Sequence, residues 1–178
     1  MGEILVRKLE IGECDRIREI DASQYIGRAW REVDGVRQLV EIDYLDPDFP
    51  EGYEVHLAAV KSTLHEGGAA YGAFDTDDRL VGFVTINRQV FGERFKHVLL
   101  DQMFVNKEDR NRGIGKQLFQ RALETARNWD VDKLYICAGS AEETILFYRA
   151  VGCKEAEEIN QEFYEDDPRD WQLEYAIK

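Results

Sequence analysis

A change of hydrophobic period between residues 99 and 129 constrains the fold more than any other feature of the sequence. Residues 99–105, Leu-Leu-Asp-Gln-Met-Phe-Val, have the apolar and β-branched character of a buried strand. From residue 114 onward the apolar residues recur at helical spacing, at Ile114, Leu118, Ala122, Ala126 and Trp129. A strand that leads through a short loop into an amphipathic helix predicts an α/β fold.

The loop between this strand and this helix has the composition of an anion site. Gly113 and Gly115 allow the backbone to approach a ligand closely and to take positive φ. The free N–H groups of the first helical turn and the helix dipole favour negative charge at the same place. Arg110, Arg112 and Lys116 add fixed positive charge. We therefore predict that residues 110–116 bind an anionic group, the alternative being an ordinary glycine turn with no ligand.

Two common phosphate loops do not fit these residues. A Walker A loop needs Ser or Thr after its Gly-Lys pair, but Gln117 follows Lys116, and Arg110 stands where the first glycine should be. A dinucleotide fingerprint needs Gly or Ala three residues after its second glycine, where this chain has Leu118.

The run Arg110-Asn111-Arg112-Gly113-Ile114-Gly115 resembles the coenzyme A pyrophosphate loop of the GNAT N-acetyltransferase superfamily. Residues 105–109 resemble the strand end and turn that precede that loop. A second resemblance is the Phe147-Tyr148 pair followed by Gly152, in which Cys153 replaces the usual aromatic residue. The resemblance covers about residues 80–153. It implies acetyl-CoA as co-substrate, no metal, and direct acetyl transfer to an amine in a ternary complex.

The resemblance also implies which residues bind the co-substrate. The pyrophosphate would lie on the backbone of Arg110, Asn111, Arg112, Gly113, Ile114, Gly115 and Lys116. Main-chain groups of Met103, Phe104 and Val105 would hold pantetheine as an added strand and polarise the thioester carbonyl. The family often has an Asn near the position of Ala141, and Ser140 or Glu142 is the substitute available here.

Tyr148 matches the tyrosine that commonly acts as general acid toward the coenzyme A thiolate. Its alternative role is packing of the ring alone. Asp101 occupies a strand position where the family often carries an acidic residue, so it is the candidate general base, the alternative being a strand-end salt bridge. Glu174 is a further candidate. Four acidic residues lie in one segment, namely Glu41, Asp43, Asp46 and Asp48. They could attract a cationic acceptor, or they could form a solvated loop.

Composition excludes several partners. Acidic residues exceed basic ones by 36 − 23 = 13, which repels nucleic acid phosphates and anionic membranes. No apolar run approaches the ~20 residues of a membrane span, and no signal peptide pattern is present at the start.

Cys14, Cys137 and Cys153 are expected to be buried reduced thiols of a cytoplasmic protein. Many relatives in the family are dimers, so a homodimer stays open.

At 178 residues we expect a single domain over residues 1–178. Strands are predicted at 3–9, 69–74, 80–90, 98–105, 133–138, 155–163 and 171–177. Helices are predicted at 11–20, with Ile11, Cys14 and Ile17 inward, and at 30–40, 53–65, 114–129 and 141–151, the last with Ser140 as N-cap. Residues 41–52 are expected to form an acidic loop. The resemblance implies an α/β (α+β) fold with a mixed, mostly antiparallel sheet of six to seven strands. Its central parallel pair is splayed and helices flank it.

The function predicted from these features is transfer of an acetyl group from acetyl-CoA to a primary amine. The acceptor expected is a small cationic molecule, with a peptide or protein amine also open. The alternative is a non-catalytic module that binds acetyl-CoA and regulates or scaffolds a partner. The substitution at Ala141 and the lack of an assured general base motivate that alternative.

Overall fold

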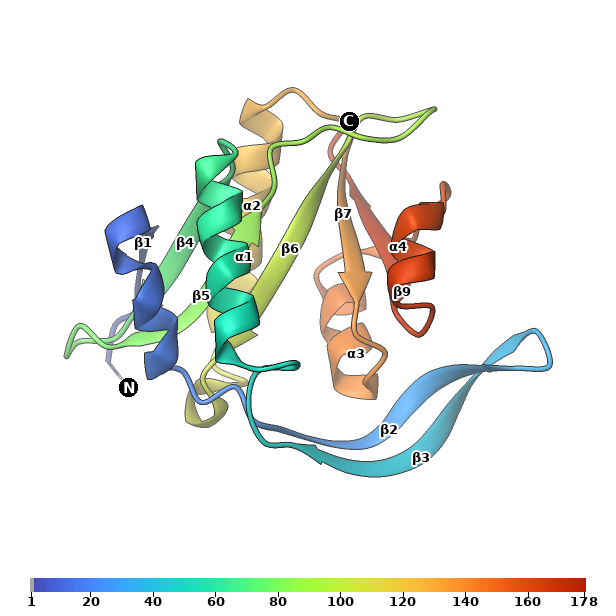
Figure 1. Ribbon diagram of the computed structural model, residues 1–178, viewed down its shortest axis with the longest axis horizontal. Helices are drawn as coiled ribbons and strands as arrows, with labels where there is room; N and C mark the ends of the chain where they lie inside the picture. The colour runs from blue at the N-terminus through green and yellow to red at the C-terminus, as the bar shows by residue number, and fades with distance from the viewer. Residues whose placement is uncertain (1) are drawn as a thin grey trace.

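A seven-stranded sheet forms the centre of the computed structural model, which describes residues 2–178 (Figure 1). The strands lie side by side in the order β1 (Leu5–Lys8), β4 (Ala69–Phe74), β5 (Leu80–Ile86), β6 (His97–Val105), β7 (Lys133–Ala138), β9 (Trp171–Ala176) and β8 (Lys154–Glu155). Only the β6–β7 pair is parallel. The predicted mixed sheet with one central parallel pair is confirmed.

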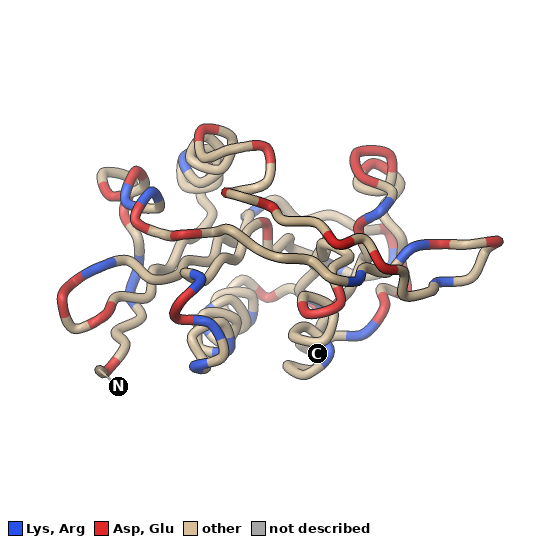
Figure 2. Tube along the Cα trace, turned by 90° about the horizontal axis from the view of Figure 1, so that it is seen from below, with Lys and Arg blue, Asp and Glu red and all other residues tan. Residues whose placement is uncertain are grey.

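Helices cover both faces of this sheet, as the view from below shows (Figure 2). One face carries the 3-10 helix η1 (Ile11–Glu19) and helix α1 (Tyr53–His65), and the other carries α2 (Ile114–Asn128) and α3 (Glu142–Ala150). A one-turn 3-10 helix, η2 (Lys107–Asp109), precedes α2, and a short helix, α4 (Gln161–Asp166), precedes β9. Within residues 2–178 no helix is long and apolar enough to cross a membrane.

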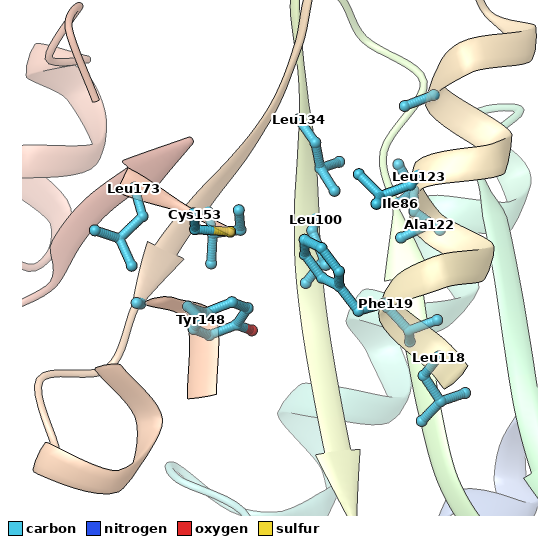
Figure 3. Packing of buried hydrophobic residues seen from close by; sticks show 14 of the residues in the cluster. Ile86, Leu100, Leu118, Phe119, Ala122, Leu123, Leu134, Tyr148, Cys153 and Leu173 are labelled. Carbon is cyan, nitrogen blue, oxygen red and sulfur yellow. The ribbon is translucent and has the colours of Figure 1, made fainter. Parts of the chain in front are cut away.

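The predicted apolar stripe of α2 packs directly on the sheet. Leu118, Ala122 and Ala126 have no exposed surface and belong to the larger core cluster (Figure 3). Burying such a stripe is the main source of stability for a helix of this length. In η1, Cys14 is buried as predicted, but Ile11 is 46% exposed, so its predicted inward position is wrong.

The helix predicted at 30–40 is wrong. These residues form a long hairpin of β2 (Gln24–Val33) and β3 (Val36–Asp46), a two-stranded sheet that one isolated bridge, Ala29–Ala141, joins to the start of α3. Its two-residue loop, Asp34-Gly35, has φ of 50° and 77°. Positive φ at both positions is the I′ geometry that matches the twist of paired strands, and an Asp-Gly loop favours it. The segment predicted to be an acidic loop therefore belongs to β3 as far as Asp46.

Three further boundaries differ from the prediction. Strand β5 ends at Ile86 rather than at residue 90, and β8 is only Lys154–Glu155, so of the predicted strand 155–163 only Glu155 belongs to a strand. The rest of that segment leads into α4, which Asn160 caps because its Oδ1 accepts from the Phe163 amide at 3.0 Å. Ala141, not Ser140, is the N-cap of α3, since the Ser140 hydroxyl accepts from Arg31 Nη1 at 2.6 Å.

Candidate active site

The two parallel strands separate halfway along their length. Their pairing runs from His97–Lys133 to Leu100–Ile136 and then stops. At the same level the β5–β6 register shifts, so that Ile86 pairs with Leu100 while Thr85 pairs with Gln102. Asp101 is the extra residue of a β-bulge, and a bulge bends its strand. The splay that the resemblance implied therefore begins at Asp101.

Beyond the bulge, alternate backbone groups of β6 face the gap. The amide of Gln102 donates to Thr85 Oγ1 at 3.1 Å, and that of Asn106 donates to Val81 O at 2.8 Å, both toward β5. Because successive amides in a strand point to opposite sides, the amides of Met103 and Val105 face the gap. An extended ligand can therefore pair with β6 where β7 no longer does.

The gap opens into a cavity of about 1180 Å³, called here the central cavity. Its lining comes from the splayed part of β6, the loop that leads into α2, the end of β7, α3, and the segment between α4 and β9. The lining includes most of the predicted site, namely Asp101, Met103, Phe104, Val105, Arg110, Asn111, Gly113, Ile114, Gly115, Lys116 and Tyr148. Residues around the start of β2 and near the start of α1, among them His56, complete the lining, so distant parts of the chain meet around one space.

At one end of the central cavity the N-terminus of α2 carries positive charge. Gly113 is the N-cap, with φ of 82°, and no side chain caps the helix. A Cβ built on Gly113 would meet no atom within 4 Å, so space for a ligand is open beside the free amides. Arg110 lines this end, with its Nε 3.0 Å from Val105 O, and burial lowers the pKa of its guanidinium.

Gly115 has a different role from Gly113. A Cβ at Gly115 would lie 3.1 Å from the Phe147 ring, so the glycine allows α3 to pack closely against the start of α2. Two predicted co-substrate residues lie outside the lining. Arg112 binds Asp109 at 2.6 Å, and Ser140 is held by the hairpin residue Arg31.

Tyr148 lies on α3 with its ring in the core and its hydroxyl directed across the gap toward the β6 side (Figure 3). The residue is 6% exposed, and burial holds the pKa of the phenol well above its usual value. Within residues 2–178 the hydroxyl makes no hydrogen bond that would occupy its proton. The phenol is therefore protonated at neutral pH and free to donate.

Asp101 faces the central cavity beside His56, a residue that no sequence pattern marks. Water reaches the Asp101 carboxyl through the cavity, but surrounding protein partly desolvates it and raises its pKa, which nearby His56 opposes. His56 comes from α1, with Nε2 2.7 Å from Pro50 O and Nδ1 2.6 Å from Gln102 Oε1. The imidazole and the carboxylate lie close together only because α1 packs against the β6 bulge.

The end of the cavity opposite α2 is acidic. Asp166, Asp167 and Asp170 line it from the segment between α4 and β9, with Arg169 as the basic residue among them. Burial, and then the nearby Asp167, raise the pKa of Asp170 to about 7. Figure 2 shows the acidic positions of the short helix α4 that leads into this segment.

These are not the carboxylates singled out from the sequence. Glu41, Asp43, Asp46 and Asp48 lie on or just after β3, and none of them lines the central cavity. Glu174 is fully buried on β9, 2.7 Å from Lys133 Nζ, and is also outside the lining.

Cys137 differs from the prediction of a buried thiol. It lies on β7 immediately after the last residue paired with β6, and it is half-buried in the cavity floor. Burial, and then the negative charges of Asp170, Asp101 and Asp166, raise the pKa of its thiol to about 12. Cys14 and Cys153 are buried as predicted, and all three thiols are free.

Comparison with known proteins identifies the same fold. The family model described as the acetyltransferase (GNAT) family matches residues 33–153, about two thirds of the chain. A search of curated protein sequences gives no match.

Among solved structures, nourseothricin acetyltransferase superposes with a TM-score of 0.73 at 19% identity, covering 98% of this chain and 99% of that one. A candidate streptothricin acetyltransferase of Bacillus anthracis str. Ames, in complex with acetyl coenzyme A, gives 0.70 at 15% identity, covering 98% and 97%. PaiA N-acetyltransferase of Thermoplasma acidophilum, in complex with coenzyme A, gives 0.61 at 15%, covering 98% and 99%. At these identities the likeness is one of fold.

Proposed function

This chain belongs to the acetyltransferase (GNAT) family, and on that basis we propose that it transfers the acetyl group of acetyl-CoA directly to a primary amine. The observation that carries the proposal is the continuity of one cavity. It joins an uncapped, cationic helix N-terminus to a splayed strand with outward-facing amides, and then to a carboxylate and a phenol. Two of the similar structures were solved with acetyl coenzyme A or coenzyme A.

The α2 end of the cavity suits the pyrophosphate of coenzyme A. The amides of Ile114, Gly115 and Lys116 precede the first residue that bonds within the helix, since Gln117 N donates to Gly113 O at 3.1 Å. Three free amides and the helix dipole favour a doubly anionic group there. The side chains of Arg110 and Lys116 add positive charge from the same lining.

The splayed strand would then orient the thioester. The gap-facing amides of Met103 and Val105 can hydrogen-bond to the amide groups of pantetheine in the way that a neighbouring strand would. An N–H that points to the thioester oxygen stabilises the oxyanion that develops during attack. Acetyl-CoA supplies the activated acetyl group, and the chain supplies position and charge.

Asp101 is the proposed general base. An amine arrives as an ammonium ion, so one proton must leave before its nitrogen can attack the carbonyl carbon. A carboxylate whose pKa is raised by partial desolvation is a stronger base than an ordinary aspartate. The proton lost from the ammonium goes to Asp101 directly or through one water.

Tyr148 is the proposed general acid. When the new N–C bond has formed and the C–S bond breaks, the sulfur leaves with the electron pair and takes the phenol proton. The second proton that the nitrogen loses, as the amide forms, restores the phenol. A phenol with a raised pKa donates only to a strong base, and a thiolate in the same surroundings is one. Burial raises the pKa of two nearby thiols, Cys137 and Cys153, to about 12.

Calorimetric titration with acetyl-CoA, followed by a thiol-release assay with a panel of amines, tests this proposal. We expect Kd in the micromolar range, loss of binding in Gly113→Glu, and unchanged binding in the control Gly35→Glu, which has the same positive φ at the hairpin tip. Failure of the wild-type protein to bind would refute the proposal. Binding without thiol release from any amine would support the non-catalytic module instead.

A further inference from the structure

Within residues 2–178 two carboxylates on opposite sides of the central cavity have no ion-pair partner. Asp101 lies on the β6 bulge, and Asp170 lies just before β9. Within residues 2–178 neither carboxylate forms an ion pair or accepts a side-chain hydrogen bond. Both act on the thiol of Cys137, which lies between them on β7. A partly desolvated carboxylate without a cation is costly, so a ligand that supplies the cation is stabilised there.

The basic residue of the same wall does not neutralise Asp170. Arg169 Nε lies 3.4 Å from Asp167 Oδ1, so its guanidinium is directed to a different carboxylate. Asp166 and Asp167 add negative charge around Asp170 and contribute to the raised pKa of its carboxyl. The wall therefore keeps a net negative charge that faces the cavity.

The side chain next to Asp101 also lacks a partner. Gln102 is 6% exposed and lines the cavity, and its Nε2 is buried without a hydrogen bond. His56 Nε2 must donate to Pro50 O, because a carbonyl only accepts. A neutral imidazole that donates from Nε2 accepts at Nδ1. The Gln102 amide then turns its N–H to His56 and leaves its oxygen to accept from an ammonium.

We propose that the acceptor carries at least two ammonium groups, the reacting one received by Asp101 and Gln102 and a second one held across the cavity by Asp170. This inference rests on the proposed acetyl transfer. A monoamine would neutralise Asp101 and leave Asp170 unpaired, whereas a diamine neutralises both. The chemical class expected is therefore an aliphatic diamine or polyamine, or a larger molecule that presents two amines.

Matched pairs of amines test this inference in the thiol-release assay. Putrescine is compared with butylamine, and cadaverine with pentylamine, because each pair differs by one amino group. We expect kcat/KM for the diamine to exceed that for the monoamine by at least about tenfold. Asp170→Asn should remove this preference and change the monoamine value by less than about twofold.

Glu41→Gln is the control, because it removes a carboxylate that lies on β3 outside the cavity. It should leave the preference intact. Retained acetyl-CoA binding shows that each variant is folded. Equal use of diamine and monoamine by the wild-type protein, or an unchanged preference in Asp170→Asn, would overturn the inference while acetyl transfer itself stands.

If no amine is acetylated, the proposed function fails, and calorimetry decides the inference separately. The coenzyme A complex is titrated with putrescine and with butylamine. Binding of putrescine that Asp170→Asn loses would support a site for two cations. Absence of putrescine binding would overturn the inference.

Discussion

Replacing Tyr148 with Phe separates chemistry from packing at the candidate active site. The rings of Phe147 and Phe119 lie 5.2 and 6.3 Å from the Tyr148 ring, and these contacts survive the substitution. Because the hydroxyl has no hydrogen bond within residues 2–178, the free energy of unfolding should change by less than about 1 kcal/mol. Loss of the general acid should lower kcat by about 10²–10⁴-fold.

Tyr135→Phe is the matched control, because the residue is an equally buried tyrosine outside the cavity lining. Its hydroxyl lies 2.9 Å from Glu158 O and accepts from the Asn160 amide at 3.2 Å. Removing that hydroxyl loses its hydrogen bonds to Glu158 O, Gln172 Oε1 and the Asn160 amide, at a cost of about 1–3 kcal/mol. For a chain of this length, each kcal/mol lowers Tm by about 2–4 °C.

The two variants should therefore show opposite effects. Thermal melts should place Tyr135→Phe below the wild type and Tyr148→Phe close to it. Thiol release at saturating acetyl-CoA should fall only in Tyr148→Phe, with acetyl-CoA affinity unchanged by calorimetry. If Tyr148→Phe retained activity within twofold of wild type, its hydroxyl would be a packing feature and the assignment of the general acid would be refuted.

Three further outcomes follow from the same geometry. Asp101→Asn should lower kcat/KM by about 10²-fold at neutral pH. In the wild-type protein kcat/KM should rise with pH as Asp101 ionises, above pH ~4, and this rise should disappear in the variant. A variant with the same pH profile as wild type would exclude Asp101 as the base. Gly115→Ala should weaken acetyl-CoA binding by about tenfold in calorimetry, because its Cβ lies 3.1 Å from the Phe147 ring, whereas Gly12→Ala, with no atom within 4 Å, should leave binding unchanged. Asp170 has a pKa of about 7 in the folded protein against 3.8 as its ordinary value, so the folded state binds more protons between these pH values and stability falls as pH rises. Asp170→Asn should therefore be more stable than wild type at pH ~8, by on the order of 1–3 kcal/mol in denaturant unfolding, and equal to it near pH ~4; equal stability at both pH values would contradict the raised pKa.

The amino-acid sequence was sufficient to predict several features that depend on residues close together in the chain. The period of α2 predicted which residues meet the sheet, because a helix with one apolar stripe has one way to bury it. The positive φ expected of the loop glycines is confirmed at Gly113, the N-cap of α2, and the helix predicted at 141–151 ends before Gly152, which also takes positive φ. The Asp34-Gly35 pair is an equally local signal for the hairpin, but the apolar residues around it also recur at helical spacing and led to the wrong prediction of a helix.

Tertiary structure alone decided how distant segments combine. The bulge at Asp101 becomes visible only in the register of β6 against β5, and it sets where β6 leaves β7. His56 and Asp170 have nothing in their local sequence to mark them, yet packing of α1 and of the segment before β9 brings both to the cavity that holds Asp101. The strand–loop–helix unit and its family could be read from local sequence, because hydrogen bonding and hydrophobic period act over a few residues. The cavity and its charge required the fold, because burial and Coulomb interactions act through space between residues far apart in the chain.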